Sequence, residues 1–115
     1  MNDTFQGLVD RCLPLPGVAG CSIRLADRTF FSRCQGGWFT PAQAEQALSR
    51  LALAADSLSQ HGIQPTRLSW VFEHLRIYLV LREDAACLAL FVENPSDSSP
   101  ELERLLEEFA GMREL

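Results

Sequence analysis

Four cysteines are the first residues in this 115-residue chain that could do chemistry, as metal ligands, as a disulfide or as a nucleophile. A tetrahedral zinc site usually draws its ligands from close C-x-x-C pairs, and the sequence contains none. Disulfides are uncommon in the cytosol, where thiols are kept reduced. We therefore expect buried free thiols, with a disulfide or a metal site as the lesser alternative. The four are Cys12, Cys21, Cys34 and Cys87.

The two histidines, His61 and His74, are far apart in the sequence and lack cysteines or carboxylates at ligand spacing. Glu73 next to His74 is the kind of acid–base pair that turns produce routinely. The chain has no glycine-rich phosphate loop, no G-x-S-x-G and no H-E-x-x-H motif. Catalysis needs convergent groups, so we predict a protein that is not an enzyme and uses neither a cofactor nor a resident metal.

Charge and composition restrict the partners. The net charge is −5, and all ten basic residues are arginine without forming a basic stripe. Nucleic acid and anionic membranes are therefore poor partners. No apolar run approaches the roughly 20 residues that span a bilayer, and the N-terminus lacks the basic start of a signal peptide. With 47% hydrophobic residues, we expect one folded cytoplasmic domain over residues 1–115.

The element that organises the chain is a long helix predicted over residues 41–61. Thr40 can cap it, Pro41 suits its first position, and Gln43 stands where a capping box needs it. Gly62 follows as a suitable C-terminal cap. One apolar face recurs at helical spacing and would cover a sheet. It comprises Ala44, Ala47, Leu48, Leu51, Ala55 and Leu58.

The opposite face of this helix is small and uncharged, with Glu45, Arg50 and Asp56 only at its edges. A solvated helix face is normally charged, whereas small side chains let another helix approach closely. We interpret this face as a second packing surface, for a dimer or another partner, and expect Leu53→Arg to weaken that contact. The face comprises Ala42, Gln46, Ser49, Leu53, Ser57 and Gln60.

The remaining elements are predicted in the order αββαβββα. Residues 85–92 are apolar on both faces, which indicates a central strand with helices on either side. Connections of hairpin length make the sheet antiparallel. The first hairpin is expected to turn at Asp27-Arg28, where glycine would be the preferred second residue. The strands are expected at 18–26, 29–34, 66–73, 76–82 and 85–92, with a first helix over 3–13 and a last helix from Pro100.

A glycine-hinged loop, Q-G-G-W-F at residues 35–39, precedes the long helix. Trp38 could be an exposed partner contact, and we include it among the interface residues. The favoured alternative is that Trp38 and Phe39 tie the loop onto the body of the domain.

Several stretches of the sequence match the pattern of one known family. Leu-Pro-Gly-Val at residues 15–18, continuing as A-G-C-S-I-R-L-A-D, resembles the L-P-G-V-x-G entry into the first strand, closed by an aspartate, of the Roadblock/dynein light chain family. The alanine-rich helix, three closing strands ending at E-N-P (93–95) and a last leucine-rich helix also fit. One departure is Arg28, where the family commonly has glycine, and it bears on the tightness of the first turn.

The resemblance implies an α+β fold, a profilin-like α/β/α sandwich with a five-stranded antiparallel sheet in the order 2-1-5-4-3. Family members are typically dimers joined through the middle helix and third strand. They act as scaffolds or regulators of Ras-like small GTPases. For this chain, the resemblance implies a non-catalytic bacterial homodimer, joined through helix 41–61 and strand 66–73, with a small GTPase as partner.

Two other functions remain open at this point. A small acidic secretion chaperone, binding an unfolded segment of an exported protein, would fit the low pI and the acidic last helix. A profilin-like sensor could bind a small ligand in its core, although nothing in the sequence marks a cavity.

Overall fold

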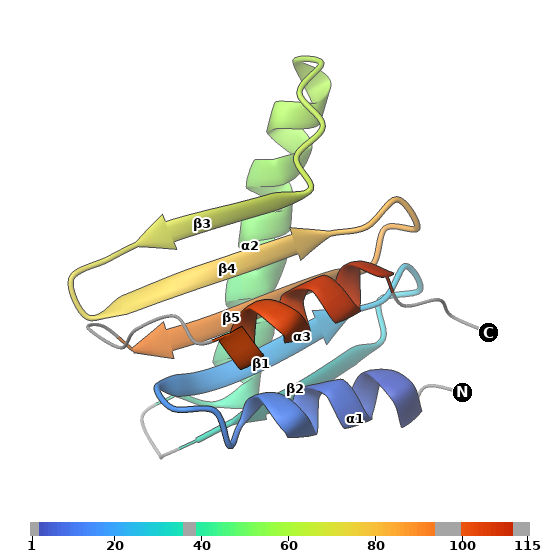
Figure 1. The fold of residues 1–115 in the computed structure, drawn as a ribbon. Coiled ribbons are helices and arrows are strands. Elements are labelled where there is room, and N and C mark those ends of the chain that lie inside the picture. Colours follow the sequence, from blue (N-terminus) through green and yellow to red (C-terminus); the bar gives the residue numbers. More distant parts are fainter. Residues whose placement is uncertain (1–2, 36–38, 94–99, 112–115) are drawn as a thin grey trace.

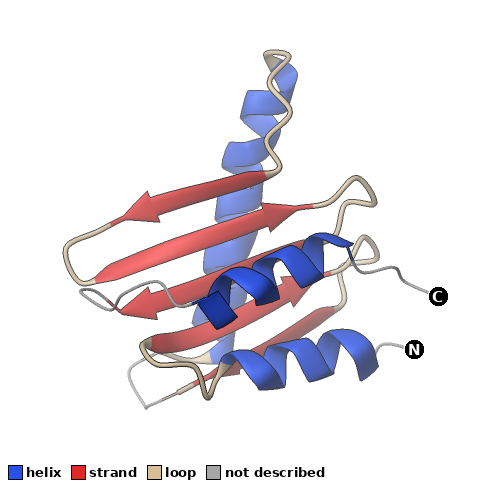
Figure 2. Ribbon diagram, in the orientation of Figure 1, coloured by secondary structure: helices blue, strands red, loops and turns tan. Residues whose placement is uncertain are grey.

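The computed structural model describes residues 3–35, 39–93 and 100–111. One sheet separates two helical layers, with α2 on one face and α1 and α3 on the other (Figures 1 and 2). The predicted element order is confirmed. The elements are α1 (Asp3–Cys12), β1 (Val18–Arg24), β2 (Phe30–Cys34), α2 (Pro41–Gln60), β3 (Arg67–Val71), β4 (Leu75–Leu81), β5 (Cys87–Glu93) and α3 (Pro100–Gly111).

The sheet has the order β2-β1-β5-β4-β3, and every neighbouring pair is antiparallel. This is the order that the family resemblance implied. In the central strand β5, every residue from Cys87 to Val92 is buried, as its apolar pattern predicted. The two edge strands are β2 and β3.

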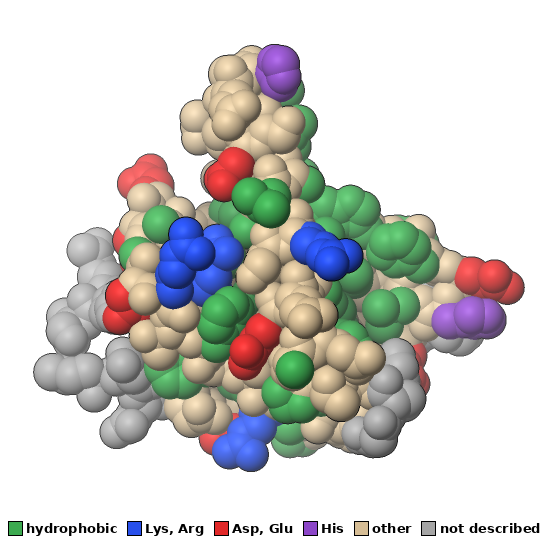
Figure 3. Space-filling model, turned by 180° about the vertical axis from the view of Figure 1, so that it is seen from behind, with side chains coloured by type: hydrophobic (Ala, Val, Ile, Leu, Met, Phe, Trp, Pro, Cys, Tyr) green, Lys and Arg blue, Asp and Glu red, His purple; other side chains and the backbone are tan. Residues whose placement is uncertain are grey.

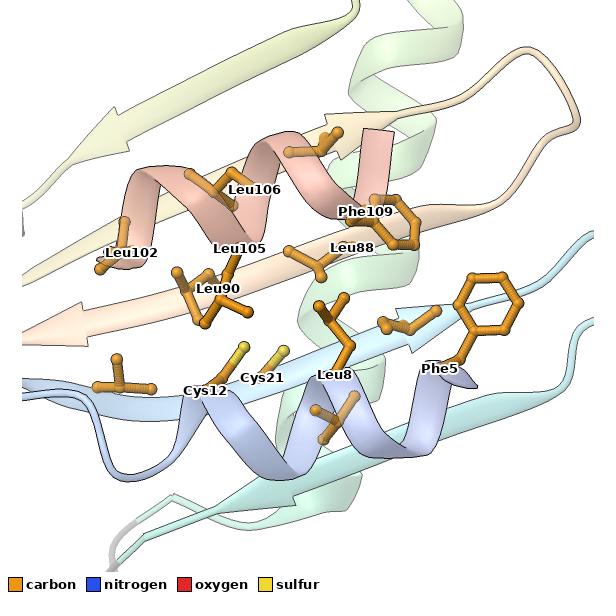
Figure 4. Close-up of a cluster of buried hydrophobic side chains, with 14 of the residues drawn as sticks. Phe5, Leu8, Cys12, Cys21, Leu88, Leu90, Leu102, Leu105, Leu106 and Phe109 are labelled. Carbon is orange, nitrogen blue, oxygen red and sulfur yellow. The ribbon is translucent and has the colours of Figure 1, made fainter. Parts of the chain in front are cut away.

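Two hydrophobic cores lie on the two faces of the sheet. The first packs α1 and α3 against alternate residues of β1 and β5, including Cys21 and Leu90 (Figure 4). The second packs α2 against the opposite face, which is lined by small residues such as Ala19 and Ala89. Small residues there let a helix lie close to the sheet.

The first hairpin differs from the expected two-residue turn at Asp27-Arg28. The N–H of Arg28 donates to Leu25 O, and the N–H of Leu25 donates to Thr29 O, both at 2.9 Å. The loop therefore has three residues, and Arg28 takes a left-handed conformation with φ 71°. Three-residue hairpin loops require such a residue at this position, and glycine usually supplies it.

Helix α2 begins with the predicted capping box. Thr40 Oγ1 accepts from the N–H of Gln43 at 3.2 Å, and Gln43 Oε1 accepts from the N–H of Thr40 at 2.9 Å. The helix ends at Gln60, and Gly62 follows with φ 82°. Figure 1 shows that α2 crosses the strands and that its C-terminal end projects past β3. A 20-residue helix is about 30 Å long, which exceeds the width of five strands spaced about 4.8 Å apart.

Candidate interaction surface

The face of α2 that covers the sheet is narrower than its apolar periodicity predicted. Ala44, Leu48 and Ala55 are buried as expected, and Ala52, which the predicted face did not include, is buried with them. Three further residues that were assigned to this face are only half-buried, because the sheet covers one side of the helix and not its flank. They are Ala47, Leu51 and Leu58.

The small, uncharged face of α2 points away from the sheet. Leu53 is 68% exposed, and Ser49 is half-buried. Arg50 and Asp56, at the edges of this face, are exposed. The rest of the face is exposed too, namely Ala42, Gln46, Ser57 and Gln60.

A second set of exposed hydrophobic residues lies at the β3 edge, beyond the part of the sheet that α2 covers. Val71 is 74% exposed and Phe72 is 52% exposed, while Leu68 and Trp70 are half-buried against the α2 core. Ile63, just after α2, is 53% exposed. On the α2 face of the molecule, Figure 3 shows hydrophobic side chains gathered beside α2. Exposed hydrophobic groups at an uncovered sheet edge commonly mark an interaction site.

The sequence-based prediction included strand 66–73 in the contact but did not name Val71, Phe72 or Ile63 as contact residues. Val71 is the residue that interrupts the alternation of apolar and polar residues in this strand. In a strand that is covered on one face, an apolar residue out of phase must point toward the other face. Val71 is therefore placed on the α3 side of the sheet, where α3 does not cover it.

On that other side, the acidic α3 is joined to the rest of the fold by arginines. Arg67 Nη2 donates to Glu103 Oε1 at 2.9 Å, and Arg11 Nη1 donates to Glu108 Oε1 at 3.2 Å. The hydrogen bond from Arg67 is the main cause that lowers the pKa of Glu103. These contacts occupy part of the acidic face that would otherwise be available to a basic partner.

The cysteines form no reactive centre within the described residues. All four are free, and three are buried as expected, whereas Cys34 is half-buried. A hydrogen bond with Cys12, followed by burial, raises the pKa of Cys21, and burial raises the pKa of Cys87. Raised pKa values keep thiols protonated and unreactive.

No group of three potential metal-ligating residues comes together in the described part of the chain. An open hollow of about 480 Å³ lies beside the loop after α1, lined by residues 13–19 with Gln35 and Glu93. Glu93 is the one carboxylate among these lining residues, and none of them is a histidine or a cysteine. Among the described helices, none combines the length and hydrophobicity needed to cross a membrane.

Of the loop before α2, the structure describes Gln35 and Phe39, so the prediction for Trp38 lies outside the described residues. Phe39 packs edge-on against Phe91, with ring centroids 4.8 Å apart. Gly20 lies beneath it, because a Cβ there would stand 3.2 Å from the Phe39 ring and 2.9 Å from Cys34 Sγ. Phe39 therefore packs onto the body of the domain, which is the role that the favoured alternative in the sequence analysis gave it.

Together, the sheet order, the three helices and their two layers define the Roadblock-type fold. No protein-family model matches the sequence, and no significant match occurs among curated proteins. Solved structures do match. MglB of Myxococcus xanthus has a TM-score of 0.67 at 14% identity, with 94% of this chain and 82% of that chain covered.

Two further solved structures show the same architecture. The Roadblock/LC7 domain from Streptomyces avermitilis has a TM-score of 0.60 at 16% identity, covering 89% of this chain and 88% of that one. The gliding protein MglB from Thermus thermophilus has a TM-score of 0.63 at 14% identity, covering 89% of this chain and 87% of that one. At such low identity the likeness establishes the fold, and it leaves the partner of this chain to be proposed.

Proposed function

We propose that this chain is a non-catalytic, cytoplasmic scaffold that forms a homodimer and regulates a Ras-like small GTPase or a related signalling or motility partner. The observation that carries the proposal is the exposure of large hydrophobic side chains on α2, just after its C-terminal end and at the β3 edge of the sheet. Leu53, Ile63, Val71 and Phe72 are the large hydrophobic residues most exposed in the described structure, and all belong to these two elements or lie directly beside them.

The likeness to MglB and to a Roadblock/LC7 domain supports a regulator rather than a catalyst. The contact surface on α2 is proposed to be its outward face, for a second copy or for the GTPase. We propose Trp38 as a further contact. The proposed residues on the helix are Ala42, Gln46, Ser49, Leu53, Ser57 and Gln60.

Light scattering of the purified chain tests the dimer, and nucleotide analysis tests the partner. We expect twice the monomer mass of 12.8 kDa in the micromolar range. A tagged chain should retain from its host a folded protein that carries GDP or GTP. A monomer at all these concentrations would refute the dimer. Retention of a disordered exported segment, without nucleotide, would favour a secretion chaperone.

A further inference from the structure

The four cysteines divide evenly between the two faces of the sheet. Cys12, the last residue of α1, and Cys21, in the middle of β1, belong to the core that lies under α1 and α3. The other two, Cys34 and Cys87, belong to the core on the α2 side. Each face of the sheet therefore holds two thiols, and the two pairs differ in geometry.

Cys12 and Cys21 lie in contact with one another. Figure 4 shows their sulfur atoms side by side between α1 and β1, and the two thiols share a hydrogen bond. Their side chains are only 1% and 0% exposed, so the contact is made inside the core. A disulfide between them therefore needs only a small approach of two sulfur atoms that already touch.

The two cysteines on the α2 side are separated. Cys34 pairs with Gly20 across the sheet, whereas Cys87 pairs with Arg24, four residues further along the same strand β1. At about 3.4 Å per residue, this spacing puts them roughly 14 Å apart along the strand direction. The Cα atoms of a disulfide lie within about 7 Å of each other. Cys34 and Cys87 therefore cannot bond in the folded chain, and they provide an internal control.

While α1 is in place, the contacting thiols are protected from reaction. Their hydrogen bond, followed by burial, raises the pKa of Cys21, and only a thiolate attacks an oxidant efficiently. Cys12, however, ends a helix of ten residues and is followed by the segment L-P-L-P-G. Short helices open locally more easily than central strands do. Because α1 covers Cys21, lifting the end of α1 exposes both thiols together.

We propose that Cys12 and Cys21 form a redox pair, whose disulfide fastens the end of α1 to β1 when the chain meets oxidised glutathione. In the opened chain, the Cys12 thiolate attacks one sulfur of oxidised glutathione, and one glutathione thiolate leaves. Cys21 then attacks the Cys12 sulfur of the mixed disulfide, and the second glutathione leaves. Two cysteine sulfurs are oxidised, and one glutathione disulfide is reduced to two thiols, which take up the two cysteine protons.

This pair would make the stability of the α1 layer depend on the redox state. In the cytosol of most organisms, the disulfides that do form are usually transient and catalytic or redox-sensing. The pair lies on the face of the sheet opposite α2, so the inference is independent of the proposed dimer and of its partner.

Peptide mapping of the full-length chain, equilibrated with mixtures of oxidised and reduced glutathione, tests the bond. Trypsin cleaves after Arg11 and Arg24, so both cysteines remain in the single peptide 12–24. This peptide should lose the mass of two hydrogen atoms and resist alkylation, whereas Cys34 and Cys87 should not be joined. The folded chain should hold the disulfide at least about tenfold more strongly than the same chain in urea. An equal or weaker disulfide in the folded chain would overturn the proposal.

Thermal unfolding provides a second readout. The oxidised wild type should unfold about 5 °C or more above the reduced protein, because the bond restricts the unfolded chain. Cys12→Ser should abolish this rise, and Cys34→Ser, which removes one thiol from the other face, should retain it. A rise that persists in Cys12→Ser or disappears in Cys34→Ser would refute the assignment. The peptide map of the wild type decides the question even if a variant folds poorly.

Two matched leucine substitutions test the opening of α1. Leu8 in α1 and Leu48 in α2 are both 0% exposed, and each packs on its own face of the sheet. Under conditions where both variants remain folded, Leu8→Ala should speed formation of the disulfide several-fold over Leu48→Ala. Equal acceleration by the two substitutions would show that oxidation follows global unfolding, and it would overturn the local opening.

Discussion

At the scale of single residues, the two hairpin loops next to the central sheet carry conformational strain. Arg28 and Ala85 are the non-glycine residues with positive φ in the described structure, at 71° and 72°. Asp27 Oδ1 accepts from the N–H of Thr29 at 2.9 Å, and Asp84 Oδ1 accepts from the N–H of Ala86 at 3.1 Å. The hydrogen bonds that these aspartates accept stabilise each loop. The loop conformation nevertheless requires Arg28 or Ala85 to adopt left-handed backbone angles, which are unfavourable for non-glycine residues.

We predict that Arg28→Gly raises the free energy of unfolding by about 0.5–1 kcal/mol. An L-residue in the left-handed region costs roughly 1–2 kcal/mol, and the greater flexibility of unfolded glycine offsets part of that gain. Urea denaturation would measure the change. Ala26→Gly, in the same loop but without positive φ, is the control and should be destabilising. Equal effects at the two sites would contradict the strain argument.

At the scale of elements, an ion pair between Arg67 and Glu103 joins α3 to the edge strand β3. Because Arg67 lowers the pKa of Glu103, this pair stabilises the fold above the ordinary pKa of glutamate. The contribution is lost as the pH falls through the lowered value. The pair is partly exposed, so its contribution at pH 7 is small.

Glu103→Gln should therefore lower stability at pH 7 by about 0.5 kcal/mol, with a smaller difference at acidic pH. Glu101→Gln is a matched control, because Glu101 lies in the same first turn of α3 and favours the helix dipole equally. The unfolding temperatures of both variants, measured over a range of pH, would distinguish the two substitutions. A pH-independent effect at Glu103, or an equal one at Glu101, would argue against the ion pair.

The helices also show what the spacing of apolar residues can and cannot predict. Apolar spacing correctly placed Ala44, Leu48 and Ala55 of α2 in the core, since it reports which side of an element is hydrophobic. It could not show that Ala47 and Leu51 would remain half-exposed, because the limit of burial depends on where the helix crosses the sheet. The left-handed conformation of Arg28 could not be predicted from local residue propensity either, because hydrogen bonds in the loop impose a conformation that arginine does not favour.

At the scale of the whole molecule, a dimer would couple folding to concentration. Association that stabilises only the folded state raises the unfolding temperature as protein concentration increases. We expect a rise of several degrees over a hundredfold range of concentration for the wild type, since 1 kcal/mol corresponds to about 4–8 °C in a domain near this size. Leu53→Arg, which places a charge on the outward face of α2, should show a smaller dependence. Calorimetry at several concentrations would measure both, and a concentration-independent wild type would count against association.

The opposite edge of the sheet has a consequence for how far assembly could extend. A sheet with two pairing edges could add copies indefinitely and grow into a filament. In β2, however, Arg33 is exposed and its Nε contacts Asp10 of α1 at 3.1 Å, so a charged pair stands at that edge. Charged groups at an edge strand oppose further pairing. Growth that begins at β3 would therefore terminate at two chains, giving a closed particle instead of a polymer.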